Sequence, residues 1–71
     1  MRQIDEDLVN ASRNGHTEVV QLLLNARADV HARNDWAIRR ASSNGHTEVV
    51  QLLLAHYREN NLKIPTGYRI A

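Results

Sequence analysis

The sequence contains no cysteine and no phenylalanine, and it has only one proline, one tryptophan and three glycines. Without cysteine the chain can form neither a disulfide framework nor a thiolate zinc site, and it lacks a cysteine nucleophile. Nine basic and eight acidic residues nearly balance, so neither a strongly basic nucleic-acid-binding arm nor an acidic disordered tail is expected. No apolar run approaches the roughly 20 residues that span a bilayer, and Met1–Asp7 has no apolar signal-peptide core. We therefore expect a cytoplasmic or nuclear protein.

The chain has 71 residues, enough for one small domain at most. Chains below about 70–80 residues rarely bury enough core without disulfides, a metal or a partner. Because phenylalanine is absent, the core must be built mainly from Leu, Val, Ile and Ala. Stability then requires very regular helix packing, self-association or a bound partner.

An internal repeat is the most specific feature of the sequence. The segment Asn14–Leu24 recurs letter for letter as Asn44–Leu54, at an offset of 30 residues. A fixed period between about 20 and 50 residues is typical of a solenoid built from stacked units. We divide the single domain into repeat one (about 4–33), repeat two (about 34–60) and a tail (61–71).

Each repeat is predicted to contain two helices. The first helix is expected to start at Asp5 or Asp35, because an aspartate carboxylate is a good N-cap. It ends at Asn-Gly, where glycine adopts the left-handed conformation of a helix C-terminus at little cost. The positions expected to face inward are Leu8, Ala11 and Ser12, matched by Ile38, Ala41 and Ser42.

The second helix is expected to begin near Thr17 and Thr47, and in repeat two to continue to Glu59 or Asn60. It carries a wide apolar stripe with i, i+3, i+4 spacing that a single helix pair is too small to bury. The stripe in repeat one consists of Val19, Val20, Leu23 and Leu24, widened by Leu22. Between the repeats, Ala28–Ala32 alternates loosely and is predicted to be a short extended arm.

These residues resemble ankyrin repeats. The second-helix signature of the family is matched by Asn14–Leu24 and its copy, and the Gly-Ala-Asp-Val connector is matched in part by Ala28–Val30. The resemblance covers about residues 4–57 and implies an all-α fold of two stacked helix-turn-helix repeats. The family's function implies a protein–protein interaction module with neither catalytic activity nor a cofactor.

Three departures from the family pattern have structural consequences. The period is 30 residues instead of about 33, and Trp36–Arg39 replaces the usual Thr-Pro-Leu-His. This short form resembles ankyrin repeats that are abundant in giant-virus proteins. Arg27 stands where the family usually has glycine. Either its backbone is left-handed, at a cost of order 1 kcal/mol, or the second helix runs longer.

The resemblance implies that a partner binds the connector tips and the exposed side of the first helices. Carried over by position, this surface would include residues of the connector and of both first helices, which differ between the repeats: His31, Arg33, Asn34, Trp36, Val9, Asn10, Arg13, Arg39, Arg40 and Ser43. Trp36 has two interpretations. It is either a binding hot spot flanked by arginines, gripping an acidic or aromatic segment, or a structural residue that packs over repeat one and fills the place of the shortened hairpin.

Other function classes have less support. His16 and His46 occupy equivalent positions in successive repeats, about 10 Å apart on helix-packing geometry, which is too far to share one zinc. A structural histidine bonded to backbone is the simpler interpretation, so no metal is expected. No nucleophile elbow surrounds Ser12, Ser42 or Ser43, and no phosphate-binding loop is present. A helix-turn-helix nucleic-acid binder is the alternative from another class, but Thr47–Leu54, its recognition helix, has no basic residue.

Two repeats are few for a solenoid, which generally needs at least three with polar caps. We therefore expect an exposed apolar end to drive self-association, end to end or back to back, with a two-fold dimer as the commonest closed arrangement. The apolar tail residues Leu62, Ile64, Tyr68 and Ile70 leave two alternatives open: a cap folded over the last helix pair, or a frayed terminus. A fragment of a longer array is the other remaining interpretation.

Overall fold

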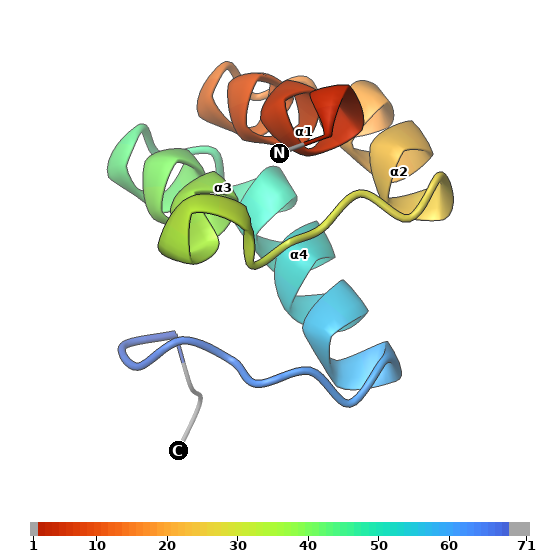
Figure 1. The fold of residues 1–71 in the computed structure, drawn as a ribbon. Helices are drawn as coiled ribbons and strands as arrows, with labels where there is room; N and C mark the ends of the chain where they lie inside the picture. The colour runs from red at the N-terminus through yellow and green to blue at the C-terminus, as the bar shows by residue number, and fades with distance from the viewer. Residues whose placement is uncertain (1, 69–71) are drawn as a thin grey trace.

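The computed structural model describes residues 2–68, which form four helices and no strand. The helices are α1 (Gln3–Arg13), α2 (Thr17–Asn25), α3 (Ala32–Ser43) and α4 (Thr47–Glu59). Helices α1 and α2 form one antiparallel pair, α3 and α4 form the next, and the second pair stacks on the first through α1–α3 and α2–α4 contacts (Figure 1). The predicted all-α fold of two stacked helical hairpins is confirmed. In the described part of the chain, no helix has both the length and the apolar character needed to cross a membrane.

The turns inside the two hairpins have nearly the same geometry. Gly15 and Gly45 have φ values of 74° and 75°, the left-handed conformation expected at a helix C-terminus. The second helices begin at Thr17 and Thr47, and α4 ends at Glu59, as the sequence predicts. The amide of His16 donates to the carbonyl of Ala11, and the amide of His46 repeats this bond to Ala41 at the same 2.9 Å.

The predicted aspartate N-caps of the first helices are wrong. Helix α1 begins at Gln3, so Asp5 lies inside its first turn. The Asp5 carboxylate accepts a hydrogen bond from the Asp29 amide at 2.7 Å and also binds Arg2, so it fastens the connector to α1. These bonds stabilise the charged form and lower the pKa of Asp5, the Asp29 amide having the largest effect.

The start of α3 is unusual because three successive residues are left-handed. Arg33, Asn34 and Asp35 have φ values of 55°, 59° and 63°, and the right-handed turns follow from Trp36 onward. Asn and Asp tolerate this conformation better than most residues. The Asp35 carboxylate does not cap the helix. It accepts a hydrogen bond from the Tyr57 hydroxyl at 2.7 Å and contacts His31 Nδ1 at 2.5 Å.

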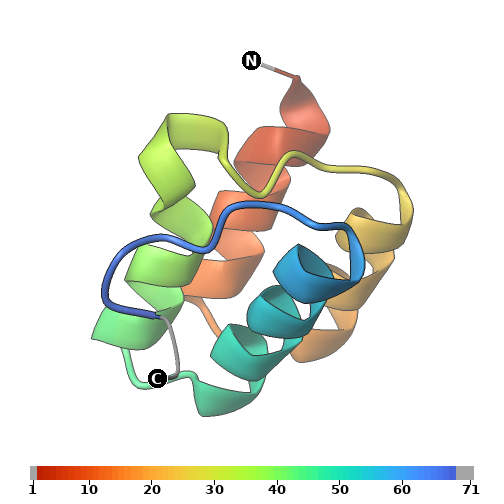
Figure 2. The ribbon, with the colours of Figure 1, turned by 90° about the horizontal axis from the view of Figure 1, so that it is seen from below.

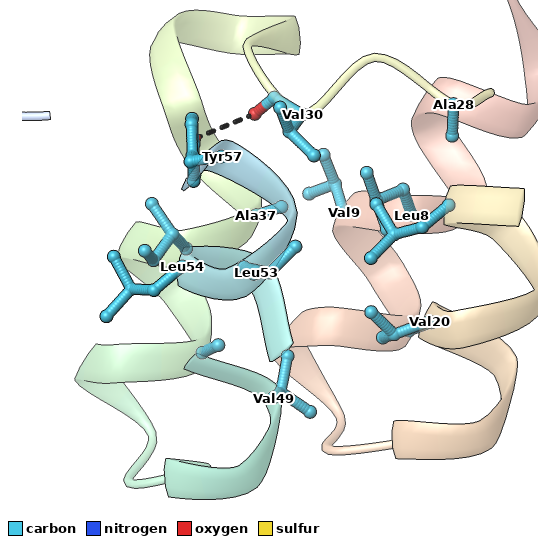
Figure 3. Close-up of a cluster of buried hydrophobic side chains, with 14 residues drawn as sticks. Leu8, Val9, Val20, Ala28, Val30, Ala37, Val49, Leu53, Leu54 and Tyr57 are labelled. Carbon is cyan, nitrogen blue, oxygen red and sulfur yellow. Dashed lines mark hydrogen bonds between the residues drawn. The ribbon is translucent and has the colours of Figure 1, made fainter. Parts of the chain in front are cut away.

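The hydrophobic core runs continuously through both repeats (Figure 3). It is aliphatic, as the missing phenylalanine requires, except for one completely buried aromatic ring, that of Tyr57. The core residues come from all four helices and the connector: Leu8, Val9, Ala11, Val20, Leu24, Ala28, Val30, Ala37, Ile38, Ala41, Val49, Leu53, Leu54 and Tyr57. The two hairpins therefore share one core, which explains how units too small to fold alone stabilise each other.

The connector between the repeats contains no strand, so the predicted extended arm is limited to Ala28 and Asp29, which lack regular structure. Arg27 is left-handed with φ 69°, the first of the two alternatives considered for it. A cost of order 1 kcal/mol is expected there, because Arg replaces a residue without a Cβ. Ala28 and Val30 point into the core and anchor this irregular segment.

The described part of the tail packs as a cap. Leu62, Ile64 and Tyr68 are half-buried against the core, and Pro65 is buried. From the end of α4 the tail crosses the underside of repeat two toward α3 (Figure 2). Of the two alternatives, the cap is therefore supported for residues 62–68, while Ile70 lies outside the described residues.

The predicted inward stripes are only partly correct. Val19 and Leu22 on α2 are 45% and 66% exposed, although both were assigned to the buried stripe. Ser12 is buried as expected, but its counterpart Ser42 is exposed. The reason is the same in each case. Only a neighbouring repeat can cover these positions, and the two-repeat stack has no further repeat at either end.

Candidate functional site

The left-handed turn Arg33–Asp35 presents a cluster of basic and aromatic side chains. Trp36 follows the turn and is 40% exposed, so a large part of its side chain is accessible to a partner. The guanidinium carbon of Arg40 lies 5.4 Å from the centre of the Trp36 ring, one helical turn further along α3. This cation–π contact fixes both side chains on one exposed face of α3.

Arg33 and Arg39 are both tied to the turn. Arg33 Nη2 lies 2.8 Å from the carboxylate of Glu6, and this hydrogen bond raises the pKa of Arg33 above its ordinary value. Arg39 Nε donates to the carbonyl of Asn34 at 3.0 Å. Both side chains are exposed, but the charge of Arg33 is paired with Glu6, whereas the bond from Arg39 goes to a neutral carbonyl.

A polar groove of about 390 Å³ lies between this turn and the tail. Its walls are His31, Asn34, Asp35 and Arg39 on one side and Lys63, Pro65 and Thr66 on the other. Asp35 is the acidic residue of this lining, and its carboxylate is held by the Tyr57 hydroxyl and His31. Arg39 and Lys63 make the remaining lining positively charged.

Tyr57 contacts two residues of the groove wall, His31 and Asp35. Its ring is buried beside the ring of His31, with 5.2 Å between the ring centres. Burial, together with the hydrogen bond to Asp35, raises the pKa of the Tyr57 hydroxyl well above its ordinary value of 10.0. The hydroxyl therefore stays protonated and donates to Asp35 at physiological pH.

The structure places most of the residues predicted for binding at the surface. Arg33, Asn34, Trp36, Arg39, Ser43, Asn10 and Arg13 are exposed, and His31 and Arg40 are half-buried. Val9 is a correction, because it is only 4% exposed and packs in the core between α1 and α3. Since Arg39 occupies the same repeat position, Arg39 lies on the face of α3 that a third repeat would cover.

The sequence analysis did not predict four residues that form or support the groove: Lys63, Thr66, Asp35 and Tyr57. The tail was expected to act as a cap or to fray, and nothing in its composition shows which part of α3 it meets. One feature of the sequence could have indicated the contact between Asp35 and Tyr57: a single tyrosine interrupts the apolar face of α4, and its hydroxyl needs a partner there.

His46 has the predicted structural role, since its Nε2 lies 2.9 Å from the carbonyl of Arg13 in the preceding repeat. With a carbonyl as acceptor, this nitrogen is the donor. Within residues 2–68, no group of three or more His, Asp or Glu side chains is placed to hold a metal ion.

Comparison with known proteins identifies the family. The model of ankyrin repeats (many copies) matches residues 8–54, which is more than half of the chain. No curated protein matches significantly. No solved structure matches significantly either. Ankyrin repeats are generally protein–protein interaction modules without catalytic activity. The matched segment contains both copies of the repeated sequence and the connector between them, and we conclude that this chain belongs to the ankyrin-repeat family.

Proposed function

We propose that this chain is a protein-binding module that holds a partner through the connector and the exposed side of α1 and α3. The observation that carries the proposal is Trp36, exposed and braced by Arg40 immediately after a left-handed turn. Trp and Arg are the residues most enriched among binding hot spots. The proposed activity is binding alone, without catalysis, cofactor or nucleic acid, in the cytoplasm or nucleus.

An acidic segment is the partner chemistry that fits this surface best. Arg39, Arg40 and Lys63 lie around Trp36 and the neighbouring groove, whereas Arg33 is already paired with Glu6, and Asp35 with Tyr57 and His31. Arginine side chains pair carboxylates in a two-pronged geometry, and the tryptophan ring offers a flat apolar surface beside them. Asn10, Arg13 and Ser43 extend the same exposed side toward the hairpin turns.

The strained backbone supports a binding role for this turn. Residues other than glycine held in the left-handed region cost of order 1 kcal/mol or more each, and such strain gathers at binding sites. Arg33, Asn34 and Asp35 are consecutive left-handed residues whose side chains or carbonyls meet Glu6, Arg39 and Tyr57. The turn therefore projects Trp36 from a fixed backbone.

The test is selection of peptides from a random display library, followed by affinity measurement on individual binders. We expect the selected peptides to be rich in Asp and Glu. We also expect Trp36→Ala to weaken their binding at least about tenfold, the loss typical of a hot spot. Arg40→Ala is expected to have a smaller effect in the same direction.

The matched control is Glu18→Ala, which changes an exposed side chain on α2, away from the connector. It should leave peptide affinity unchanged, and circular dichroism should show that Trp36→Ala remains folded. Selected peptides that bind Trp36→Ala and Arg40→Ala as tightly as the unchanged chain would overturn the proposal.

Self-association is the second component of the proposal. Val19 and Leu22 leave an apolar patch at the N-terminal end of the stack, whereas their counterparts in the second repeat are buried (Val49) and half-buried (Leu52). Burial of exposed apolar side chains of this kind drives association. A thermal melt followed by circular dichroism over about a hundredfold range of concentration tests it, because the midpoint rises with concentration only when folding is linked to association. A midpoint that stays constant would contradict it.

A further inference from the structure

The joint between the two repeats shows in detail how such surfaces fit together. We call the side of a repeat turned toward the N-terminal end of the stack its leading face, and the opposite side its trailing face. The leading face of repeat two docks on the trailing face of repeat one. At this joint the Asn44 side chain and the His46 ring both lie 2.9 Å from the carbonyl of Arg13.

The backbone at Gly15 is part of the same joint. A Cβ added to Gly15 would come within 2.6 Å of His46 Nδ1, so the histidine ring lies directly against this glycine. Val49 and Leu53 complete the joint from α4, on the side that faces repeat one, whereas Leu54 lies on the opposite side of the helix (Figure 3). The joint thus combines apolar contacts with two bonds to one carbonyl.

Both halves of this joint occur a second time, at least partly open, at the two ends of the molecule. In the leading face of repeat one, the turn and second helix have the same sequence as in repeat two, with Val19 and Leu22 exposed. The trailing face of repeat two repeats that of repeat one, with Ser42 and Gly45 exposed. A Cβ added at Gly45 would meet nothing within 4 Å, which is the space that His46 fills at Gly15.

The positions that differ between the two joint surfaces are complementary in charge. Ala37 and Val9 are both buried where α3 packs on α1 (Figure 3). The offset of 30 residues places Asp7 at the position of Ala37 on the open leading face, and Arg39 at the position of Val9 on the open trailing face. A second copy stacked in the same way would therefore bring Asp7 of one copy opposite Arg39 of the other.

The charge of the two halves favours the same arrangement. Residues 1–30 contain three basic and five acidic side chains, a net charge of −2, while residues 31–71 contain six basic and three acidic, a net charge of +3. Packing the leading face of one copy on the trailing face of the next brings opposite charges together. A two-fold pair of leading faces would instead oppose two acidic halves, which is unfavourable.

The tail covers part of the trailing face and competes with a second copy. It crosses beneath α3 and α4 (Figure 2), with Ile64 half-buried and Pro65 buried, and Lys63 and Arg39 both line the groove. The region around Ser42 and Gly45 is left open. The tail is thus placed to limit how tightly, and how far, copies can stack.

We propose that copies of this chain associate head to tail, the leading face of one on the trailing face of the next, with the tail as the segment they displace. This inference rests on the proposed self-association but not on partner binding by Trp36. The two partners use different faces for this contact, so it is heterologous and does not close on itself. The expected products are oligomers whose length increases with concentration.

Sedimentation velocity over about a hundredfold concentration range, with paired charge reversals, tests the arrangement. Asp7→Arg and Arg39→Asp are each expected to weaken association at least about tenfold, because each places like charges across the joint. Mixing the two variants should restore association as oligomers in which the two variants alternate, since each face of one variant then meets the opposite charge on the other. The double variant should assemble by itself.

Ile64→Ser, which loosens the tail, should strengthen association at least about tenfold while circular dichroism shows the helices intact. The charge control is Glu48→Arg, because this position is exposed in both repeats and so lies outside both faces. It should behave like the unchanged chain. Two results would overturn the proposal: a monomer at every concentration even with Ile64→Ser, or loss of association with Asp7→Arg but not with Arg39→Asp. In either case the peptide-binding effect of Trp36→Ala would be unaffected.

Discussion

Helices α2 and α4 begin with the same eight residues, yet the same side chains have different environments. Val19 and Leu22 are exposed, whereas Val49 is completely covered and Leu52 is half-buried. The local sequence, helix start and preceding glycine turn are identical, so only the neighbouring repeat can cause the difference. In this molecule an apolar side chain is buried by what stacks on it, and the helix alone does not determine its exposure.

The largest expected contrast is between Leu53→Ala and Leu23→Ala. Leu53 is fully buried in the joint, so its loss removes apolar contacts and leaves a cavity, at a cost of about 2–5 kcal/mol. Leu23 is half-buried at the open end, where water can fill the space, and about 1 kcal/mol is expected. Urea unfolding of both variants measures the difference. Equal losses would mean that the open end is covered in solution. If the loss for Leu23→Ala depends on concentration, the covering surface is a second copy of the chain.

Tyr57→Phe tests the C-terminal end of α4, which has no counterpart in repeat one. There the position equivalent to Tyr57 is occupied by Arg27. Removing the hydroxyl breaks its bond to the Asp35 carboxylate, and about 1.5–3 kcal/mol of stability should be lost. Urea unfolding at neutral pH measures this loss. A change below about 0.5 kcal/mol would show that the bond does not stabilise the folded chain.

The same tyrosine predicts a dependence of stability on alkaline pH. Its pKa is raised in the folded chain, so its contribution is complete below the unfolded value of about 10 and is lost as the pH rises above that value. Unfolding measured from pH 7 to 11 should show a steep decline above pH 10 that Tyr57→Phe makes shallower. Tyr68→Phe is the matched control and should keep the steep decline.

The two hairpin glycines are expected to differ by about 1 kcal/mol. Alanine at either position is strained by the left-handed backbone, at about 1–2 kcal/mol. At Gly15 the added Cβ also collides with the ring of His46, whereas at Gly45 it meets open space. Gly15→Ala should therefore be the more destabilising change in thermal unfolding. In the double variant Gly15→Ala/His46→Ala the ring is absent, so the alanine at position 15 should cost only the backbone strain and not the collision.

The sequence predicts the repeated parts of this fold well. Identical segments imply identical hairpins, and Thr17, Thr47, Gly15 and Gly45 lie where the repeat places them. The errors concern positions whose environment depends on the ends of the stack, such as Ser42 and Leu22, because periodicity cannot show which repeats have neighbours. Val9 was placed at the surface because its counterpart is arginine, although a side chain facing α3 has to be apolar.

The binding surface was predictable only in outline. Divergence between the repeats pointed to Trp36 and Arg40, and these side chains are accessible. The left-handed turn before them was not predictable, because it depends on the contacts that Asp35 makes with Tyr57 and His31. Tyr57 is far from Asp35 in the sequence, and nothing in the sequence shows that His31 contacts Asp35. The same limit applies to Lys63, whose place in the groove depends on the path of the tail.

The smallest contrast concerns the two equivalent histidines. His46 bonds the carbonyl of Arg13 across the joint, whereas within residues 2–68 no such bond is found for the ring of His16. His46→Ala should therefore cost about 0.5–1 kcal/mol in thermal unfolding, and His16→Ala close to nothing for an isolated molecule. If copies stack head to tail, His16 gains the carbonyl of Ser43 in the next copy as its acceptor, just as His46 has that of Arg13. His16→Ala should then lower the melting midpoint at high concentration and not at low concentration. A loss that is the same at every concentration would mean that the two histidines differ only in their own repeats, and the stacking of copies would lose this support.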